Sequence, residues 1–254
     1  MNALAGRHAL VTGGGTGIGA AIATTLARAG ALVTICGRRQ RPLQTIAEED
    51  SNIRAMTADV TDETSVAKVY QQAEADGEPI DIVVANAGMA ESAPAHKTSL
   101  DLWTRTLNVN LTGAFLTVKP ALAGMRERGR GRIVFIASTA GLKGYAYVAP
   151  YVAAKHGVVG LARALAVETA ATGITVNAVC PGFTDTPMLN QSIRHIVETT
   201  KRNEADVRAD LAQHNAQARF IQPKEVADVV FWLCSDAGAA VTGQAIAVSG
   251  GETW

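Results

Sequence analysis

The chain has 254 residues, and 48% of them are hydrophobic, which is enough to build one large core. Lys and Arg together number 23, as do Asp and Glu, so the zero net charge gives no reason to expect a nucleic acid or an anionic membrane as partner. No stretch approaches the ~20 apolar residues of a membrane span. Three widely spaced cysteines without C-x-x-C spacing argue against a disulfide framework and favour a reducing, cytoplasmic location.

Short apolar runs alternate with longer amphipathic segments along the chain. Val- and Ile-rich runs predict buried strands at 8–12, 32–36, 54–57, 80–85, 132–137, 174–179 and 245–248. Between them, apolar spacing predicts helices at about 18–29, 63–73, 102–125, 151–171 and 223–234. This alternation predicts an α/β fold in which helices cover both faces of a parallel sheet, that is, one doubly wound Rossmann domain over residues 1–254.

One segment, residues 183–222, interrupts this alternation. It contains no predicted strand, and the charged run around 201–208 suggests at most short surface helices. Long connections in compact domains are usually functional or disordered, and this one follows a strand end, where open α/β sheets bind ligands. We expect a substrate lid here; the alternative is an insertion without a role in binding.

The first predicted strand runs directly into a glycine-rich turn. Glycine permits positive φ and lets the backbone approach a pyrophosphate, while the following helix offers free N–H groups. The spacing is T-G-x-x-x-G-x-G rather than G-x-G-x-x-G. We therefore expect a dinucleotide at this turn, held by Thr12, Gly13, Gly15, Thr16, Gly17, Ile18 and Gly19.

The end of the second predicted strand bears on the choice of cofactor. An acidic residue about 20 residues after the glycines would bind a ribose 2′-hydroxyl, whereas an arginine accommodates a 2′-phosphate. The acidic position falls at Gly37, and Arg38 and Arg39 follow. Guanidinium groups suit phosphate, so we expect NADP(H) rather than NAD(H). Alternatively, the two arginines only solvate a strand end.

A tyrosine and a lysine four residues apart share one face of a predicted helix. Side chains at this spacing lie on adjacent turns, so the ammonium of Lys155 comes close to the phenol of Tyr151. A nearby positive charge lowers the pKa of a phenol, which makes the pair a candidate acid/base for an alcohol oxygen. Ser138 follows a predicted strand at the ligand-binding edge of the sheet and can donate to a carbonyl.

Together these motifs resemble the short-chain dehydrogenase/reductase family over essentially the whole chain. The markers are the 12–19 turn, Asp59-Val60, Asn86-Ala87-Gly88, Ser138 with Tyr151 and Lys155, and Pro181-Gly182, in family order. The resemblance implies that Asn110 completes a catalytic tetrad with Ser138, Tyr151 and Lys155. It also implies cofactor contacts from Asp59, Val60, Asn86, Ala87, Gly88, Tyr151, Lys155, Pro181, Gly182, Thr184 and Thr186, and assembly as a homotetramer.

The sequence around Ser138 and Tyr151 is similar to 3-oxoacyl and aromatic-polyketide ketoreductases. We expect NADPH-dependent reduction of a 3-oxoacyl thioester or a cyclic ketone, with Tyr151 as proton donor. Substrate contacts are expected from Ser138, Leu142, Tyr145, Tyr147, Met188 and Leu189. The alternatives are catabolic oxidation of an alicyclic or aromatic secondary alcohol or a 3-hydroxyacyl-CoA, and a catalytically idle cofactor-binding sensor. Because the histidines lack H-x-x-x-H spacing, we expect no metal.

Overall fold

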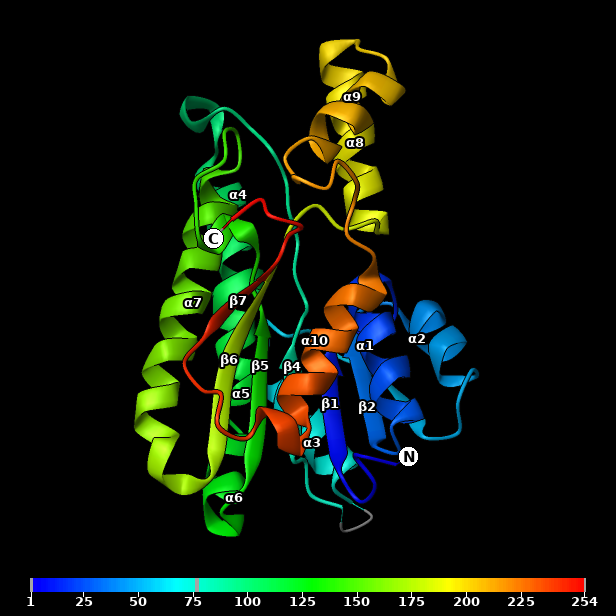
Figure 1. The fold of residues 1–254 in the computed structure, drawn as a ribbon, viewed down its shortest axis with the longest axis vertical. Coiled ribbons are helices and arrows are strands. Elements are labelled where there is room, and N and C mark those ends of the chain that lie inside the picture. Colours follow the sequence, from blue (N-terminus) through cyan, green and yellow to red (C-terminus); the bar gives the residue numbers. More distant parts are fainter. Residues whose placement is uncertain (1, 76–77, 254) are drawn as a thin grey trace.

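A seven-stranded parallel sheet forms the centre of the computed structural model, which describes residues 2–75 and 78–253 (Figure 1). The strand order is β3-β2-β1-β4-β5-β6-β7, so the chain reverses its direction of winding between β1 and β4. The strands are β1 (His8–Thr12), β2 (Leu32–Gly37), β3 (Ile53–Thr57), β4 (Ile82–Ala85), β5 (Gly131–Ile136), β6 (Ile174–Pro181) and β7 (Ala245–Val248). The predicted doubly wound fold is confirmed.

Helices cover both faces of the sheet because successive strand side chains point to opposite sides. In β1, Ala9 and Val11 join one hydrophobic cluster with α1 (Gly17–Arg28), α2 (Gln40–Ala47) and α10 (Pro223–Cys234). Leu10, between them, joins the other cluster, beneath α3 (Glu63–Ala73), α5 (Gly113–Val118), α6 (Ala121–Arg128) and α7 (Ala149–Thr169). Short 3₁₀ turns lie at Ala95–Lys97, Thr139–Gly141, Ala170–Thr172 and Asp236–Gly238.

The single helix predicted over 102–125 is wrong in detail. The structure has α4 (Leu100–Leu107), a π turn at Asn108–Thr112, then α5, and it starts α6 anew after Pro120. Proline lacks the N–H that would continue the hydrogen-bond ladder, which explains the second break. The π turn has no such compositional signal, because Asn108–Thr112 continues the helical periodicity.

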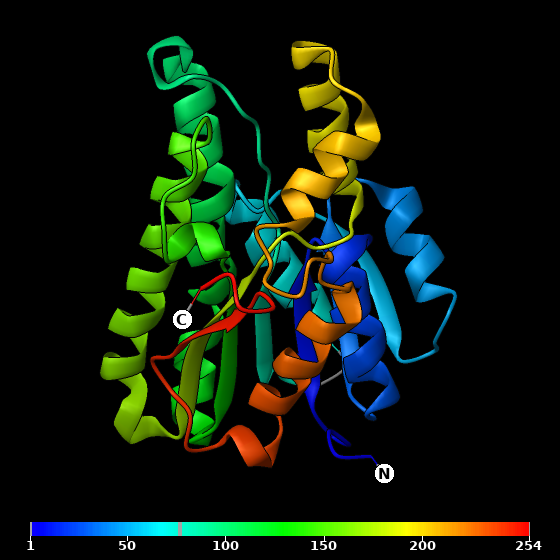
Figure 2. The same cartoon turned by 45° about the horizontal axis from the view of Figure 1, so that its top comes forward.

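The segment 183–222 also differs from its prediction, since it is mostly helical. It contains α8 (Pro187–Thr200), a helix of 14 residues, and α9 (Glu204–Ala212). Their apolar faces share a small cluster centred on Leu189, Ile193 and Val207. Figure 2 shows this helical pair standing above the sheet, opposite the segment that leads into α4. Charged surface residues interrupt the apolar pattern in this part of the sequence, so the pattern did not predict this apolar face.

Among the described residues, no helix combines the length and the apolar character needed to cross a lipid bilayer.

Candidate active site

A cleft of about 950 Å³ opens at the carboxyl edge of the sheet. Its walls come from the glycine turn after β1, the ends of the next strands, and α8. The reversal of winding between β1 and β4 opens this space, because the chain leaves neighbouring strands toward opposite faces.

The glycine turn forms one end of the cleft and is packed too tightly for other residues. Gly13 has φ +67°, and a Cβ on Gly19 would lie 2.3 Å from the carbonyl oxygen of Gly13. Thr16 precedes α1 without capping it through its side chain, so the first amides of the helix are left for a ligand. Six residues predicted to hold a dinucleotide line the cleft: Gly13, Gly15, Thr16, Gly17, Ile18 and Gly19.

Thr12 was expected to contact the cofactor, but it does not line the cleft and instead joins two strand ends. It is 2% exposed, and its hydroxyl accepts hydrogen bonds from the amides of Asn86 (3.0 Å) and Ala87 (3.1 Å). The Asn86 side chain donates in return to the carbonyl of Thr12 (2.8 Å). Thr12 thus ties the end of β1 to the end of β4, which brings Asn86, Ala87 and Gly88 to the cleft wall.

The end of β2 brings two exposed arginines to the same cleft, and Asp59 and Val60 reach it after the end of β3. Arg38 and Arg39 line it, and Gly37 places no carboxylate beside them. The carboxylate of Asp59 is engaged locally: its Oδ1 accepts from the amide (2.9 Å) and the hydroxyl (2.8 Å) of Thr61. These hydrogen bonds hold the pKa of Asp59 below its usual value, with a smaller contribution from Arg38. Val60 also lines the cleft.

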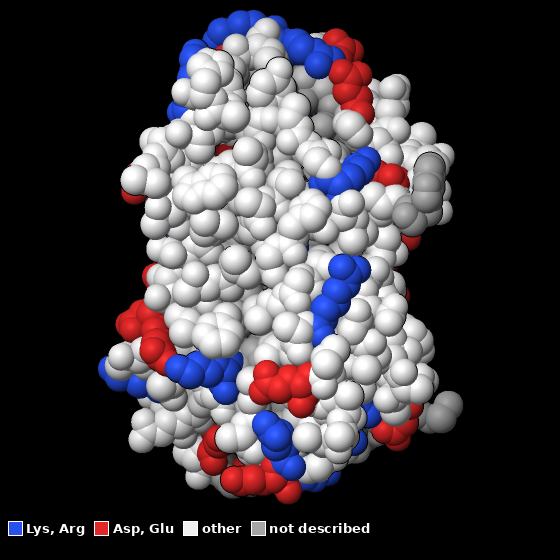
Figure 3. Space-filling model, turned by 90° about the vertical axis from the view of Figure 1, so that its left-hand side faces the viewer, with Lys and Arg blue, Asp and Glu red and all other residues white. Residues whose placement is uncertain are grey.

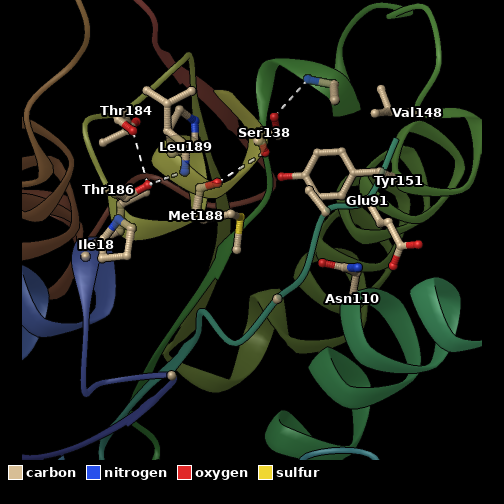
Figure 4. Close-up of a pocket in the computed structure, with 18 of the residues that line it drawn as sticks. Ile18, Glu91, Asn110, Ser138, Val148, Tyr151, Thr184, Thr186, Met188 and Leu189 are labelled. Carbon is tan, nitrogen blue, oxygen red and sulfur yellow. Dashed lines mark hydrogen bonds between the residues drawn. The ribbon is translucent and has the colours of Figure 1, made fainter. Parts of the chain in front are cut away.

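The two predicted proton-handling residues face each other across the inner end of the cleft. Figure 4 shows the Tyr151 hydroxyl, from the first turn of α7, pointing toward Ser138 at the end of β5. Ser138 Oγ accepts a hydrogen bond from the amide of Ala140 (3.1 Å). Because this bond uses an oxygen lone pair, the Ser138 hydroxyl hydrogen can be donated to the Tyr151 oxygen or to a ligand.

Lys155 lies beneath Tyr151, one turn further along α7. It is 4% exposed, and its Nζ lies 5.5 Å from the centre of the Tyr151 ring and donates to the carbonyl of Ile136 at 2.8 Å. Burial lowers the pKa of Lys155 to about 8.

In this structure burial outweighs the acidifying effect that we expect Lys155 to have on Tyr151. Burial raises the pKa of Tyr151 above its usual value, and the hydrogen bond with Ser138 offsets this only in part. Desolvation disfavours the charged form of both groups, so the phenol stays protonated while the ammonium loses its proton more readily.

Asn110 approaches the same site from the π turn and is 1% exposed. Its Oδ1 accepts from the amide of Met89 (3.1 Å), and its Nδ2 donates to the carbonyls of Met89 and Thr106, both at 2.9 Å. A Cβ on Gly88 would lie 2.8 Å from Asn110 Oδ1 and 3.8 Å from Lys155 Nζ. The structure thus brings all four members of the predicted tetrad to the cleft wall.

The outer part of the cleft is formed by apolar and aromatic side chains. It is lined by four of the residues expected to contact the substrate, Tyr145, Tyr147, Met188 and Leu189. Pro181, Gly182, Thr184 and Thr186 line the adjoining turn. Leu142 does not belong to this wall, because it packs against the core cluster under α7. The end of the 3₁₀ turn at Thr139–Gly141 directs it inward, which the residue order alone does not show.

Two aromatic wall residues were missed. Phe183 and His214 stack near Tyr145, with ring centres 6.0 Å apart for Tyr145 and Phe183 and 5.4 Å for Phe183 and His214. Phe183 directly follows Pro181-Gly182, a signal that could have found it. His214 follows α9, and only the folding of the segment 183–222 brings it to the cleft.

Comparisons with known proteins agree with this geometry. A family model described as short chain dehydrogenase matches residues 7–196. Cis-4-hydroxycyclohexanecarboxylate dehydrogenase of Sinomonas cyclohexanicum is 42% identical over 256 residues, covering 99% of this chain and 98% of that protein. Acetoacetyl-CoA reductase of Shinella zoogloeoides is 39% identical over 246 residues, covering 97% and 98%.

The fold comparison points the same way. The crystal structure of a variant of actinorhodin polyketide ketoreductase with NADPH superposes with a TM-score of 0.93 at 38% identity, covering 97% of each chain. The family match spans most of the sequence, and the relatives span nearly all of it. The chain therefore belongs to the short-chain dehydrogenase family of oxidoreductases, which act on alcohol and carbonyl groups.

Proposed function

We propose that this protein reduces a ketone to a secondary alcohol with NADPH, and that the ketone is cyclic or aromatic or belongs to a 3-oxoacyl thioester. The observation that carries the proposal is the Tyr151 hydroxyl aimed at Ser138 above the buried ammonium of Lys155. The similarity to acetoacetyl-CoA reductase and to the polyketide ketoreductase supports the substrate class.

The cofactor assignment rests on side chains of this chain. The tight glycine turn and the uncapped start of α1 fit a pyrophosphate, and Arg38 and Arg39 fit a 2′-phosphate. At the end of β2, Gly37 offers no carboxylate to a free 2′-hydroxyl. Asp59, which follows β3, is engaged by Thr61. When bound, the nicotinamide supplies the hydride.

The protein residues then handle the oxygen and its proton. Ser138 donates a hydrogen bond to the ketone oxygen and orients it toward Tyr151, which gives its phenol proton to that oxygen. Lys155 places positive charge beside the phenolate that forms, and Asn110 keeps the loop at Met89 in place behind it. Burial raises the pKa of Tyr151, so the phenol carries its proton at neutral pH, as a proton donor must.

The reverse reaction is the second candidate. The similarity to cis-4-hydroxycyclohexanecarboxylate dehydrogenase favours oxidation of an alicyclic alcohol, with Tyr151 as base. Initial rates distinguish the two: NADPH with a panel of cyclic and 3-oxoacyl ketones is compared with NADP⁺ or NAD⁺ and the matching alcohols. A catalytically idle sensor would turn over none of them.

The decisive variant is Tyr151→Phe, which removes one oxygen and keeps the ring. We expect kcat for ketone reduction to fall by at least ~100-fold, the usual contribution of general acid catalysis. NADPH binding, followed by fluorescence titration, should stay within about twofold, which shows that the site is intact. Unchanged turnover in this variant would refute the proposed chemistry.

We also propose that residues 183–222 act as a substrate lid. The outer side chains of the cleft come largely from this segment, among them Phe183, Met188 and Leu189. Its helices pack mainly on each other through their own small cluster, so the pair can move as a unit. Limited proteolysis with and without NADPH and ketone tests this: cleavage within 183–222 should slow when both are bound.

The homotetramer implied by the family resemblance remains a proposal that the surface supports. Figure 3 shows the face across α7 largely uncharged through its middle. Val167 of α7 is 82% exposed, and Trp103 of α4 and Phe115 of α5 are 39% and 40% exposed. Light scattering after size exclusion measures the mass directly, and a monomer at micromolar concentration would contradict the proposal.

A further inference from the structure

A buried carboxylate lies behind the substrate side of the cleft. Glu252 belongs to the segment after β7, and its side chain is only 1% exposed. Its Oε1 accepts a hydrogen bond from the Tyr145 hydroxyl and lies 3.2 Å from Lys143 Nζ. Its Oε2 is buried without a hydrogen-bond partner among the described residues. Burying a carboxylate this way is costly, which raises the question of what it positions.

Tyr145 is held from several sides. Its hydroxyl lies between the Glu252 carboxylate and the hydroxyl of Thr139, 2.6 Å away. The ammonium of Lys143 lies 5.0 Å from the ring centre, and the ring meets Phe183 edge-on at an interplanar angle of 89°. Because Tyr145 and Phe183 both line the cleft, the carboxylate fixes the orientation of one substrate wall.

The backbone around Glu252 is fixed as well. The amide of Gly182, at the end of β6, donates to the carbonyl of Val248 at 3.0 Å. A Cβ on Gly182 would lie 2.8 Å from Glu252 Oε2, and one on Gly250 would overlap the side chain of Asn215, only 2.0 Å away. The C-terminal turn therefore fits between the end of β6 and the end of the lid segment.

We propose that Glu252 is a positioning residue that sets ketone recognition through Tyr145, an inference that rests on the proposed ketone reduction. The carboxylate does not touch the reacting atoms, since it is not among the residues that line the cleft. It acts through Tyr145 and through Lys143, whose charge it balances. Its loss therefore changes the binding of the ketone and leaves cofactor binding and the proton donor in place.

The kinetic test compares three variants of the full chain. Glu252→Ala should raise the KM for the ketone about tenfold, the effect of losing a hydrogen bond to a charged group. The KM for NADPH and kcat should stay within about twofold. Glu252→Gln keeps an amide oxygen that can accept from Tyr145, so it should recover most of the loss. Glu127→Ala, an exposed glutamate on α6 at the other end of the sheet, is the matched control and should equal the wild type.

A second measurement needs no substrate. Hydrogen–deuterium exchange of residues 139–148 should accelerate in Glu252→Ala and not in Glu127→Ala. If the wild type reduces no ketone, the proposed function fails, and the exchange result still decides whether Glu252 holds this segment. The inference is overturned if exchange is unchanged, or if an active wild type and Glu252→Ala share the same KM for the ketone.

Discussion

Replacing Lys155 by methionine is expected to stabilise the fold while abolishing catalysis. The ammonium is buried, and its pKa falls from the ordinary 10.5 to about 8, a shift worth roughly 3 kcal/mol at about 1.4 kcal/mol per unit. Methionine fills a similar volume without a charge. It gives up the hydrogen bond to the Ile136 carbonyl, which costs about 1 kcal/mol. Lys155→Met should therefore gain roughly 2 kcal/mol at about pH 7.

The size of this gain in stability depends on pH. Between about pH 8 and 10.5 the unfolded chain binds more protons at Lys155 than the folded chain does, so wild-type stability rises with pH. At about pH 9.5 the penalty falls to roughly 1.4 kcal/mol, which leaves the variant an advantage below about 1 kcal/mol.

Urea unfolding of wild type and variant at both pH values measures these differences. Lys68→Met, at an exposed lysine on α3, is the matched control and should show no such dependence on pH. A Lys155→Met protein that is less stable than the wild type at pH 7, or whose advantage does not change with pH, would refute the assignment of a strained buried ammonium.

Three further results are expected. Gly88→Ala should lower kcat at least tenfold without loss of helix content by circular dichroism, because its methyl group would lie 2.8 Å from Asn110 Oδ1; normal turnover would show that this packing is unimportant. Arg38→Glu should raise the KM for NADPH at least about tenfold and lower the KM for NADH, since a carboxylate repels a 2′-phosphate and accepts from a 2′-hydroxyl. If the ratio of the two KM values is the same in variant and wild type, this role of Arg38 is contradicted. The kcat for ketone reduction should fall as pH rises above about 8, where Lys155 loses its charge, and a profile flat to pH 10 would exclude this origin.

The sequence was most informative where a local pattern dictates backbone conformation. The apolar run before Thr12 and the glycines after it define strand, turn and helix within a short stretch, and the structure places them accordingly. The last helix, Pro223–Cys234, begins at a proline in its first turn and was predicted with the same bounds. Helical spacing alone predicts that Tyr151 and Lys155 lie close together.

What sequence reasoning missed depends on contacts between distant segments. The α8–α9 pair is stabilised by a cluster that forms only when Leu189, Ile193 and Val207 meet, so its charged surface dominated the pattern. His214 and Glu252 reach the cleft region through turns whose direction no local signal specifies. The pKa of Tyr151 likewise depends on how much water the fold excludes, which spacing cannot reveal.

The π turn at Asn108–Thr112 has a consequence for engineered or evolved length changes in this helix. A π turn holds one residue more than a regular α-helical turn, and each residue advances a helix by about 100°. Deleting one residue there would leave a regular helix that still satisfies its backbone, yet residues within the turn would point in a different direction. The side-chain amide of Asn110 would then leave Met89, so this is a place where a shortened protein can fold well and lose its chemistry.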